Sequence, residues 1–304
     1  ITCNGADDGE INTTIQGGVP PYTYAWTYEG DPIPNTNDAS DLTGLEPGQY
    51  TVTVIDANNC PEEIFEITLV EPNLVIIEAI NLDYSGYGVS CLGASDGQIN
   101  IINTDGGAPA YNYIWTFQGS EMTQWEGSTE QINLLPGAYT ITAVDLNGCS
   151  DITNIELVEP PTGITFSAEA VDQNGVQITC DGANDGEINT SADGGVPPYT
   201  YTWTYEGDPI PNTIDASDLT GLQPGSYTVT ISDENGCEIT ETISILEPDE
   251  LILTATAVEH AGGFEITCNG ADDGEINTTI QGGVPPYTYA WTYEGDPIPN
   301  TNDA

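Results

Sequence analysis

Short segments in which apolar or β-branched residues alternate with polar ones occur along the whole chain. Thr51–Ile55 reads Thr-Val-Thr-Val-Ile, and Glu66–Val70 has the same two-residue period. In Tyr22–Tyr28 the aromatic residues occupy every second position, which places them on one face of a strand. Turns rich in Gly, Pro and Asn bound these segments, and no stretch shows helical periodicity with caps. The pattern predicts an all-β protein in which the Trp of each aromatic run lies in the core.

The strand pattern repeats with a period of 88 or 89 residues. Ile1–Ala39 recurs residue for residue as Ile266–Ala304, so we expect the chain to begin and end inside repeats. Each complete repeat closes with a Glu-Pro pair. The motif Cys-x-Gly-Ala-x-Asp-Gly begins at Cys3, Cys91, Cys180 and Cys268. We therefore expect four modules, the first truncated on its N-terminal side and the last on its C-terminal side, at residues 1–72, 73–160, 161–248 and 249–304.

Six or seven short strands in a module of this length are typical of a β-sandwich. The segment Leu45-Glu-Pro-Gly-Gln-Tyr50 resembles the corner before a late strand of fibronectin-type and immunoglobulin-like sandwiches, in which the Tyr hydroxyl binds the backbone. Tyr139 and Tyr227 lie in the matching segments. We predict tandem immunoglobulin-like (fibronectin III-like) β-sandwich modules in an elongated array. Short Glu-Pro joints would make it semi-rigid, and each module would add roughly 35 Å.

Charge excludes several classes of partner. The chain has 49 Asp and Glu residues, no Lys, no Arg and one His, so its formal net charge is −49. Binding of nucleic acid and docking on an anionic membrane both depend on Lys and Arg, so neither is expected. No apolar run approaches the roughly 20 residues of a membrane helix, so we expect no membrane insertion in this segment. Repulsion among the acids must be offset by salt or bound cations.

The residue inventory also argues against an enzyme. The one His, His260, lies in the turn Glu259–Gly263 and has no counterpart in the other modules. It therefore cannot supply a His–nucleophile pair to each repeat. Chemistry by carboxylates alone needs two acids across a cleft, for which a small sandwich leaves little room. We expect no catalytic residues and no organic cofactor.

The cysteines fall into regular pairs 57 or 58 residues apart, with Cys268 left over. Zinc is the rival interpretation, but no close second Cys or His completes a set of four ligands. We therefore predict one disulfide in each module, which requires an oxidising compartment outside the cytoplasm. The predicted pairs are Cys3–Cys60, Cys91–Cys149 and Cys180–Cys237.

Two Asp-bearing turns recur in the modules, and the predicted disulfides would bring them near one another. Converging carboxylates suit Ca²⁺, which takes six to eight oxygen ligands. The other interpretation is that Asp-Gly and Asn-Gly are turn formers and that cations associate diffusely. Both interpretations stay open at this point. The candidate Ca²⁺ ligands are Asp7, Asp8, Asp56, Asp96, Asp145, Asp185, Asp233, Asp272 and Asp273.

Sugar binding is a further possibility, because exposed aromatic rings stack on sugars. Trp125 is the best candidate, since it occurs in the second module only and lies outside the repeated aromatic run. A single aromatic residue is weak support, and a packed loop is the alternative.

A family resemblance emerges from these motifs together. The sequence resembles the SprB-type repeat in four segments of the first module, and these segments with their copies cover nearly the whole chain. The segments are Cys3–Ile11, Gly17–Trp26, Leu45–Asp56 and Asn58–Cys60. The second module departs by having Ala110 in place of the second Pro.

This resemblance implies a very large adhesin on the surface of a gliding bacterium, exported by type IX secretion. The chain would then belong to a cell-surface filament or stalk for adhesion or gliding motility. Its partners would be an extracellular surface or glycan, and other copies of the filament. Alternatively, each module would itself bind a glycan or surface and act through avidity.

Overall fold

The computed structural model describes residues 1–60, 63–173, 175–211, 213 and 215–299. The chain divides into two compact units, unit 1 (Ile1–Pro160) and unit 2 (Pro161–Ala304). Regular structure in the described part consists of strands and one turn of 3-10 helix, η1 (Thr123–Trp125), which confirms the all-β prediction. None of the described residues forms a helix that is long and apolar enough to cross a membrane.

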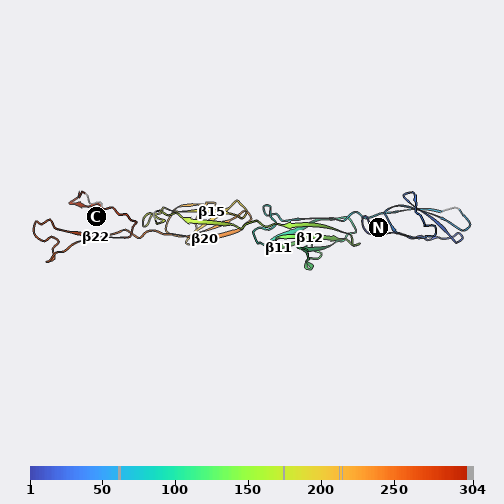
Figure 1. The fold of residues 1–304 in the computed structure, drawn as a ribbon, viewed down its shortest axis with the longest axis horizontal. Helices are drawn as coiled ribbons and strands as arrows, with labels where there is room; N and C mark the ends of the chain where they lie inside the picture. Colours follow the sequence, from blue (N-terminus) through green and yellow to red (C-terminus); the bar gives the residue numbers. More distant parts are fainter. Residues whose placement is uncertain (61–62, 174, 212, 214, 300–304) are drawn as a thin grey trace. The chain divides into compact units, whose positions relative to one another are not determined.

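The second module, in unit 1, contains a complete sandwich (Figure 1). One of its sheets has three strands in the order β11-β8-β7, and the other has four in the order β10-β9-β12-β13. All neighbouring strands are antiparallel. The strands are β7 (Ile76–Asn81), β8 (Gly97–Asp105), β9 (Asn112–Phe117), β10 (Ser120–Glu121), β11 (Glu130–Leu134), β12 (Gly137–Val144) and β13 (Ser150–Leu157).

Strand order identifies the sandwich as immunoglobulin-like. The first, second and fifth strands of the module form one sheet, and the third, fourth, sixth and seventh form the other. This is the two-sheet arrangement of fibronectin III-like modules, so the predicted fold class is confirmed. The third module repeats the order with β14-β15-β18 and β17-β16-β19-β20. Its strands are β14 (Thr165–Ala170), β15 (Gly186–Asp193), β16 (Thr200–Tyr205), β17 (Asp208–Pro209), β18 (Leu219–Leu222), β19 (Gly225–Ser232) and β20 (Glu238–Ile245).

The first and fourth modules contain parts of the same sandwich. The described residues of the first module include no counterpart of β7, and its sheets are β1-β4 and β3-β2-β5-β6. Its strands are β1 (Gly9–Ile11), β2 (Thr23–Tyr28), β3 (Asp31–Pro32), β4 (Leu42–Leu45), β5 (Gly48–Ile55) and β6 (Glu63–Leu69). The fourth contains β21 (Ile252–Ala257), β22 (Ile276–Gln281), β23 (Thr292–Tyr293) and β24 (Asp296–Pro297), paired as β21-β22 and β23-β24.

The core of each module lies between its two sheets. In the second module Ile99 of β8, Trp115 of β9 and Ile141 of β12 are fully buried in one cluster. Burying an Ile of this kind contributes roughly 2–3 kcal/mol. The Trp115 indole N–H donates to the carbonyl oxygen of Ser128 at 3.0 Å, so the ring is packed without leaving its polar atom unpaired. Trp26 and Trp203 are buried in the same way, as the alternating aromatic pattern predicts.

The predicted tyrosine corner is present in the first three modules. The hydroxyl of Tyr139 donates to the carbonyl oxygen of Leu135 at 2.9 Å. Tyr50 and Tyr227 make the same bond four residues upstream, each at 3.0 Å. These three Tyr side chains are buried, so their role is structural.

Candidate functional site: a joint between modules

Each sandwich has two ends with different chemistry, which follows from the direction of its strands. In the first module Gly9 pairs with Leu45, and Gly48 pairs with Leu69, so the Cys3 turn lies beside the end of β6. We call this the exit end, because the chain leaves the module there. The last residue of β5, Ile55, pairs with Thr23 at the opposite end. We call the opposite end the entry end.

The direction of the strands overturns the predicted disulfides. Cys60 follows β5 at the entry end, whereas Cys3 precedes β1 at the exit end. An eight-residue strand such as β5 spans roughly 23 Å at its usual rise per residue. A disulfide needs Cα atoms less than about 7 Å apart, so the two ends of one module cannot be bridged.

The observed disulfide joins two modules. Cys3 of the first module is bonded to Cys149 of the second, with Cα atoms 5.6 Å apart and a sequence separation of 146 residues. Cys91 and Cys237 are also disulfide-bonded, whereas Cys60, Cys180 and Cys268 are free and exposed. None of the three predicted pairs forms: Cys3–Cys60, Cys91–Cys149 and Cys180–Cys237 are all wrong.

At the exit end, acidic side chains hold the Cys3 turn in place. The backbone N–H of Thr2 donates to Oδ1 of Asp8 at 2.9 Å, and its hydroxyl donates to Oδ2 of the same carboxylate. The hydroxyl bond is the largest cause that lowers the pKa of Asp8. Glu71, from the closing Glu-Pro pair, accepts the N–H of Gly5 at 2.6 Å. The side-chain amide of Asn4 donates to the carbonyl oxygen of Pro72 at 3.1 Å, which fixes the turn to the departing chain.

The role of this Glu was not predicted from the sequence, in which the Glu-Pro pair was expected to form a joint. In each of the three Glu-Pro pairs that end a module, the Glu carboxylate also binds the Cys-x-Gly turn. Glu159 accepts the N–H of Gly93, and Glu247 accepts that of Gly182, both at 2.8 Å. Its recurrence beside Pro in every repeat was the available signal, because a pure hinge has no need for the same acid each time.

At the entry end of the second module, one buried carboxylate organises the loop before β13. Oδ1 of Asp145 accepts the backbone N–H groups of Asn147 and Cys149, at 2.9 and 2.8 Å. Oδ2 accepts the N–H of Ala108 at 2.7 Å, which ties two loops together. The bond from Ala108 is the largest cause that lowers the pKa of Asp145. Asp56 and Asp233 make the matching three bonds in their modules.

Polar contacts accompany the disulfide across the joint. The side-chain amide of Asn147 donates to the carbonyl oxygen of Thr2 at 3.0 Å. The linker between the two modules, residues 73–75, is fixed to the loop after β8, since the N–H of Gly107 donates to the carbonyl oxygen of Asn73 at 2.8 Å. Only three residues separate Pro72 from the first residue of β7. The first and second modules are therefore connected by the chain, a disulfide and a side-chain hydrogen bond.

The candidate Ca²⁺ ligands do not converge within a module. Asp8 lies at the exit end and Asp56 at the entry end, so the predicted proximity of these two turns is wrong. Across the joint, Asp8 and Asp145 do not share a ligand. Asp8 binds Thr2, whereas Asp145 binds the backbone N–H groups of Asn147 and Cys149, whose side chains contact the Thr2 carbonyl oxygen. In the part of the chain that the structure describes, no three His, Cys, Asp or Glu side chains are grouped so that they could hold a metal ion.

The remaining candidates occupy similar turns. Asp185 and Asp273 accept hydrogen bonds from Thr179 and Thr267, just as Asp8 does from Thr2. Asp96 accepts the N–H of Ser90 at 3.0 Å. Asp7 and Asp272 are exposed neighbours of these turn residues. This geometry agrees with the interpretation of the aspartates as turn residues.

Trp125 is half-buried and packs against the core of the second module. Its ring meets that of Trp115 edge-on, with centroids 6.3 Å apart, and lies tilted against Tyr139 at the same separation. A ring engaged with two core aromatics in this way has less surface to offer a sugar. The packed-loop interpretation fits this arrangement.

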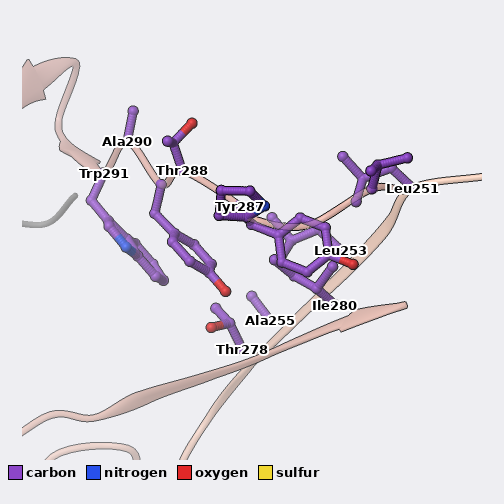
Figure 2. A pocket seen from close by; sticks show the side chains of 12 residues that line it. Leu251, Leu253, Ala255, Thr278, Ile280, Tyr287, Thr288, Ala290 and Trp291 are labelled. Carbon is purple, nitrogen blue, oxygen red and sulfur yellow. The ribbon is translucent and has the colours of Figure 1, made fainter. Parts of the chain in front are cut away.

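The fourth module contains a hollow of about 410 Å³ (Figure 2). Leu253 of β21, Ile280 of β22 and Trp291 are among its lining residues. In the third module the matching Trp203 is buried against Val229 and other core residues of β19 and β20. The described part of the fourth module has no counterpart of β19 or β20. The hollow therefore corresponds to core that those two strands fill in a complete sandwich, which makes it a poor candidate for a ligand site.

Comparison with known proteins places the recurring motif in a family. A model described as the SprB repeat matches residues 1–28, 89–117, 173–205 and 265–293. A decoration protein of Escherichia phage T5 is 45% identical over 60 residues, which cover 17% of this chain and 35% of that protein. The chain thus spans about a third of the length of this curated relative.

Two arrays of tandem domains are among the solved structures that match this chain. The three N-terminal domains of the bacteriophage RB49 highly immunogenic outer capsid protein match with 14% identity and a TM-score of 0.42, over 80% of this chain and 92% of that one. The eight N-terminal immunoglobulin domains of Down syndrome cell adhesion molecule match with 12% identity and a TM-score of 0.30, over 98% of this chain and 40% of that one. The four family matches begin near the four Cys-x-Gly turns, at the spacing of the repeat. The chain therefore contains four matches to the SprB repeat, which recur at the spacing of its modules.

Proposed function

We propose that this chain is a segment of a very large secreted repeat protein that forms a filament or stalk on a bacterial cell surface, for adhesion or gliding motility. Its role would be mechanical and not catalytic. The joint between the first and second modules is the observation that carries the proposal. A disulfide in parallel with a three-residue linker transmits tension between modules and limits their separation, which a stalk requires.

Other features agree with a position outside the cell. Persistent disulfides need an oxidising compartment, and four of the seven cysteines are disulfide-bonded. A large uncompensated negative charge keeps neighbouring chains soluble and apart. We infer that the protein is extracellular and attached to the surface of the cell that makes it.

A bead assay distinguishes a passive stalk from modules that bind a surface themselves. Beads would carry either the purified chain or bovine albumin at the same surface density, and both kinds of bead would be exposed to glass, agar and whole cells. A passive stalk predicts that the two kinds of bead are captured equally. Capture of the chain-coated beads alone, rising with the number of modules per bead, would show that the modules bind a surface themselves and would overturn the stalk.

The surface location is tested separately with an antibody raised against the second module. It should label intact cells of the producing organism, with no further gain after permeabilisation. Labelling that requires permeabilisation would contradict the proposed location.

A further inference from the structure

The free cysteines lie at ends that match the two halves of the observed joint. Cys60 occupies the same place as Cys149, four residues after the loop-organising Asp that follows β5 or β12. Cys180 and Cys268 occupy the same place as Cys3, at the start of the Cys-x-Gly turn. All three thiols are exposed.

Both kinds of half-joint are already formed without a partner. Around Cys60, the Asp56 carboxylate accepts the N–H groups of Val19, Asn58 and Cys60 at 2.9–3.0 Å, as Asp145 does in the joined module. Around Cys180, the Thr179 N–H donates to Asp185, and the Gly182 N–H donates to Glu247. The loops therefore need little rearrangement to meet a partner, which lowers the ordering cost of binding.

We propose that the entry end of the first module is a docking site for the exit end of another SprB repeat, and that the docked pair is sealed by a disulfide from Cys60. The occupant to which we commit is a second copy of this chain, offering Cys268 or Cys180. The model for the contact is the Cys3–Cys149 joint, in which the Asn147 amide binds the Thr2 carbonyl oxygen. Asn58 is the counterpart of Asn147 in the first module, and Thr179 and Thr267 are the counterparts of Thr2.

Sealing the joint is an oxidation that needs an acceptor. Two thiols lose two protons and two electrons and form one S–S bond. Oxidised glutathione, or another external disulfide, accepts them by thiol–disulfide exchange and leaves as two thiols. The reaction needs no metal. It also does not depend on whether the array serves adhesion, so its failure would not count against the proposed stalk.

The test is coupling of the intact, non-reduced chain in a buffer of oxidised and reduced glutathione. Covalent dimers would be isolated on a non-reducing gel and digested with a glutamate-specific protease, since trypsin has no site in this sequence. We expect cross-chain peptides that join Cys60 to Cys268 or Cys180. The peptides that hold Cys3 and Cys268 have identical sequences, so a Cys268→Ser chain is needed to tell them apart.

Random coupling gives a different result. With one free entry-end cysteine and two free exit-end cysteines, chance would make exit–exit pairs as abundant as entry–exit pairs. Dimers that form equally well in Cys60→Ser would overturn the proposal, because they can contain only exit–exit pairs. Loss of dimers in Cys60→Ser, with entry–exit peptides dominant in the unmodified chain, would support it.

A second variant separates docking from thiol reactivity. Asn58→Asp removes the amide donor and places a carboxylate against a carbonyl oxygen, so coupling should slow about tenfold. Asn59→Asp is the matched control, because it makes the same change of charge where the second and third modules have Gly and so have no side chain to contribute. Cys60 should react at an unchanged rate with a small aromatic disulfide in both variants. Equal slowing of dimer formation by the two variants would contradict docking through Asn58.

Discussion

At the scale of single residues, the same side chains make the same bonds in each of the first three modules. The indole N–H of Trp26, Trp115 and Trp203 donates to a backbone carbonyl thirteen residues downstream in every case. The second module differs in sequence from its neighbours yet keeps these bonds. A buried polar atom without a partner costs about 1–3 kcal/mol, so such positions tolerate few alternatives.

Removing one corner hydroxyl should weaken its own module only. Tyr139→Phe leaves the buried ring in place but removes the bond to Leu135, which should lower the free energy of unfolding of the second module by about 1–2 kcal/mol. Hydrogen exchange of the β12 amides measures this change, and the β19 amides of the third module serve as an internal control. Equal acceleration in both modules would show that the effect is not local.

The entry-end carboxylate should make the joint sensitive to acid. The N–H of Ala108, with other backbone donors, lowers the pKa of Asp145 below its ordinary value of 3.8. A group with a lowered folded pKa stabilises the fold above the unfolded pKa and loses that effect as the pH falls through the folded one. We expect the amides of Asn147 and Cys149 to keep their protection down to about pH 4 and to lose it below.

The control for this prediction is Asp145→Asn. It removes the charge at every pH, so the same two amides should exchange about tenfold faster even at pH 7. A variant whose amides behave like those of the unmodified chain at pH 7 would show that the carboxylate does not hold the loop.

At the scale of elements, the position of the linker depends on a close approach between its own backbone and the backbone of the loop after β8, at the entry end of the second module. Gly106, directly after β8, has φ +80°, and a Cβ placed on it would overlap the carbonyl oxygen of Leu74 in the linker. Gly119 has the same φ, but a Cβ there would meet no atom within 4 Å. These two glycines therefore separate backbone strain from crowding.

Alanine at the two positions should have unequal effects. Gly119→Ala incurs only left-handed backbone strain, which costs about 1–2 kcal/mol. Gly106→Ala incurs the same strain and also displaces the linker, so it should cost at least about twice as much. The free energy of unfolding of the second module, from hydrogen exchange, measures both. Equal costs would mean that the linker does not lie against Gly106 in solution.

At the scale of the whole molecule, the disulfide between modules changes which residues carry tension. When unit 1 is pulled from its two ends, force passes from Cys3 directly to Cys149. The 145 residues between them carry none while the bond is intact. Unfolding of the two sandwiches therefore adds little extension in the oxidised protein.

A single-molecule stretching experiment measures this protection. With handles at residues 1 and 160, reduction should release roughly 500 Å of additional contour length, at about 3.5 Å per residue. The Cys149→Ser chain should show the full length without reduction, and Cys60→Ser should behave like the unmodified protein. A release of clearly less than this would mean that the pairing in solution lies within modules.

Charge acts on the whole array as well. With a net charge of −49 and no Lys or Arg, repulsion cannot be offset by the protein itself. We propose diffuse cation association, because the described carboxylates do not converge on a metal site. Mg²⁺ and Ca²⁺ at equal concentration should raise the midpoint of thermal unfolding equally, in the unmodified chain and in Asp96→Asn. A rise with Ca²⁺ alone that is lost in Asp96→Asn would instead establish a specific calcium site.

The sequence by itself determined the parts of this protein that depend on local patterns. Strands follow from two-residue alternation, the buried Trp from the aromatic face, and the tyrosine corner from a six-residue motif; each can be recognised without knowing what lies across the sheet. The repeat spacing likewise agrees with the four matches to the family model, since a family motif is itself a local string.

Tertiary structure alone decided which cysteines pair and whether the two Asp-bearing turns of a module lie close together. Regular spacing suggested that Cys3 belongs with Cys60, because residues 57 apart in one repeat look like a pair. Their strands place them at opposite ends of a sandwich, and the nearest partner of Cys3 lies in the next module, 146 residues away. A regular series of cysteines along a repeat sequence is equally compatible with disulfides within modules and with disulfides between successive modules. Only the direction of the strands and the contact between successive sandwiches distinguish the two.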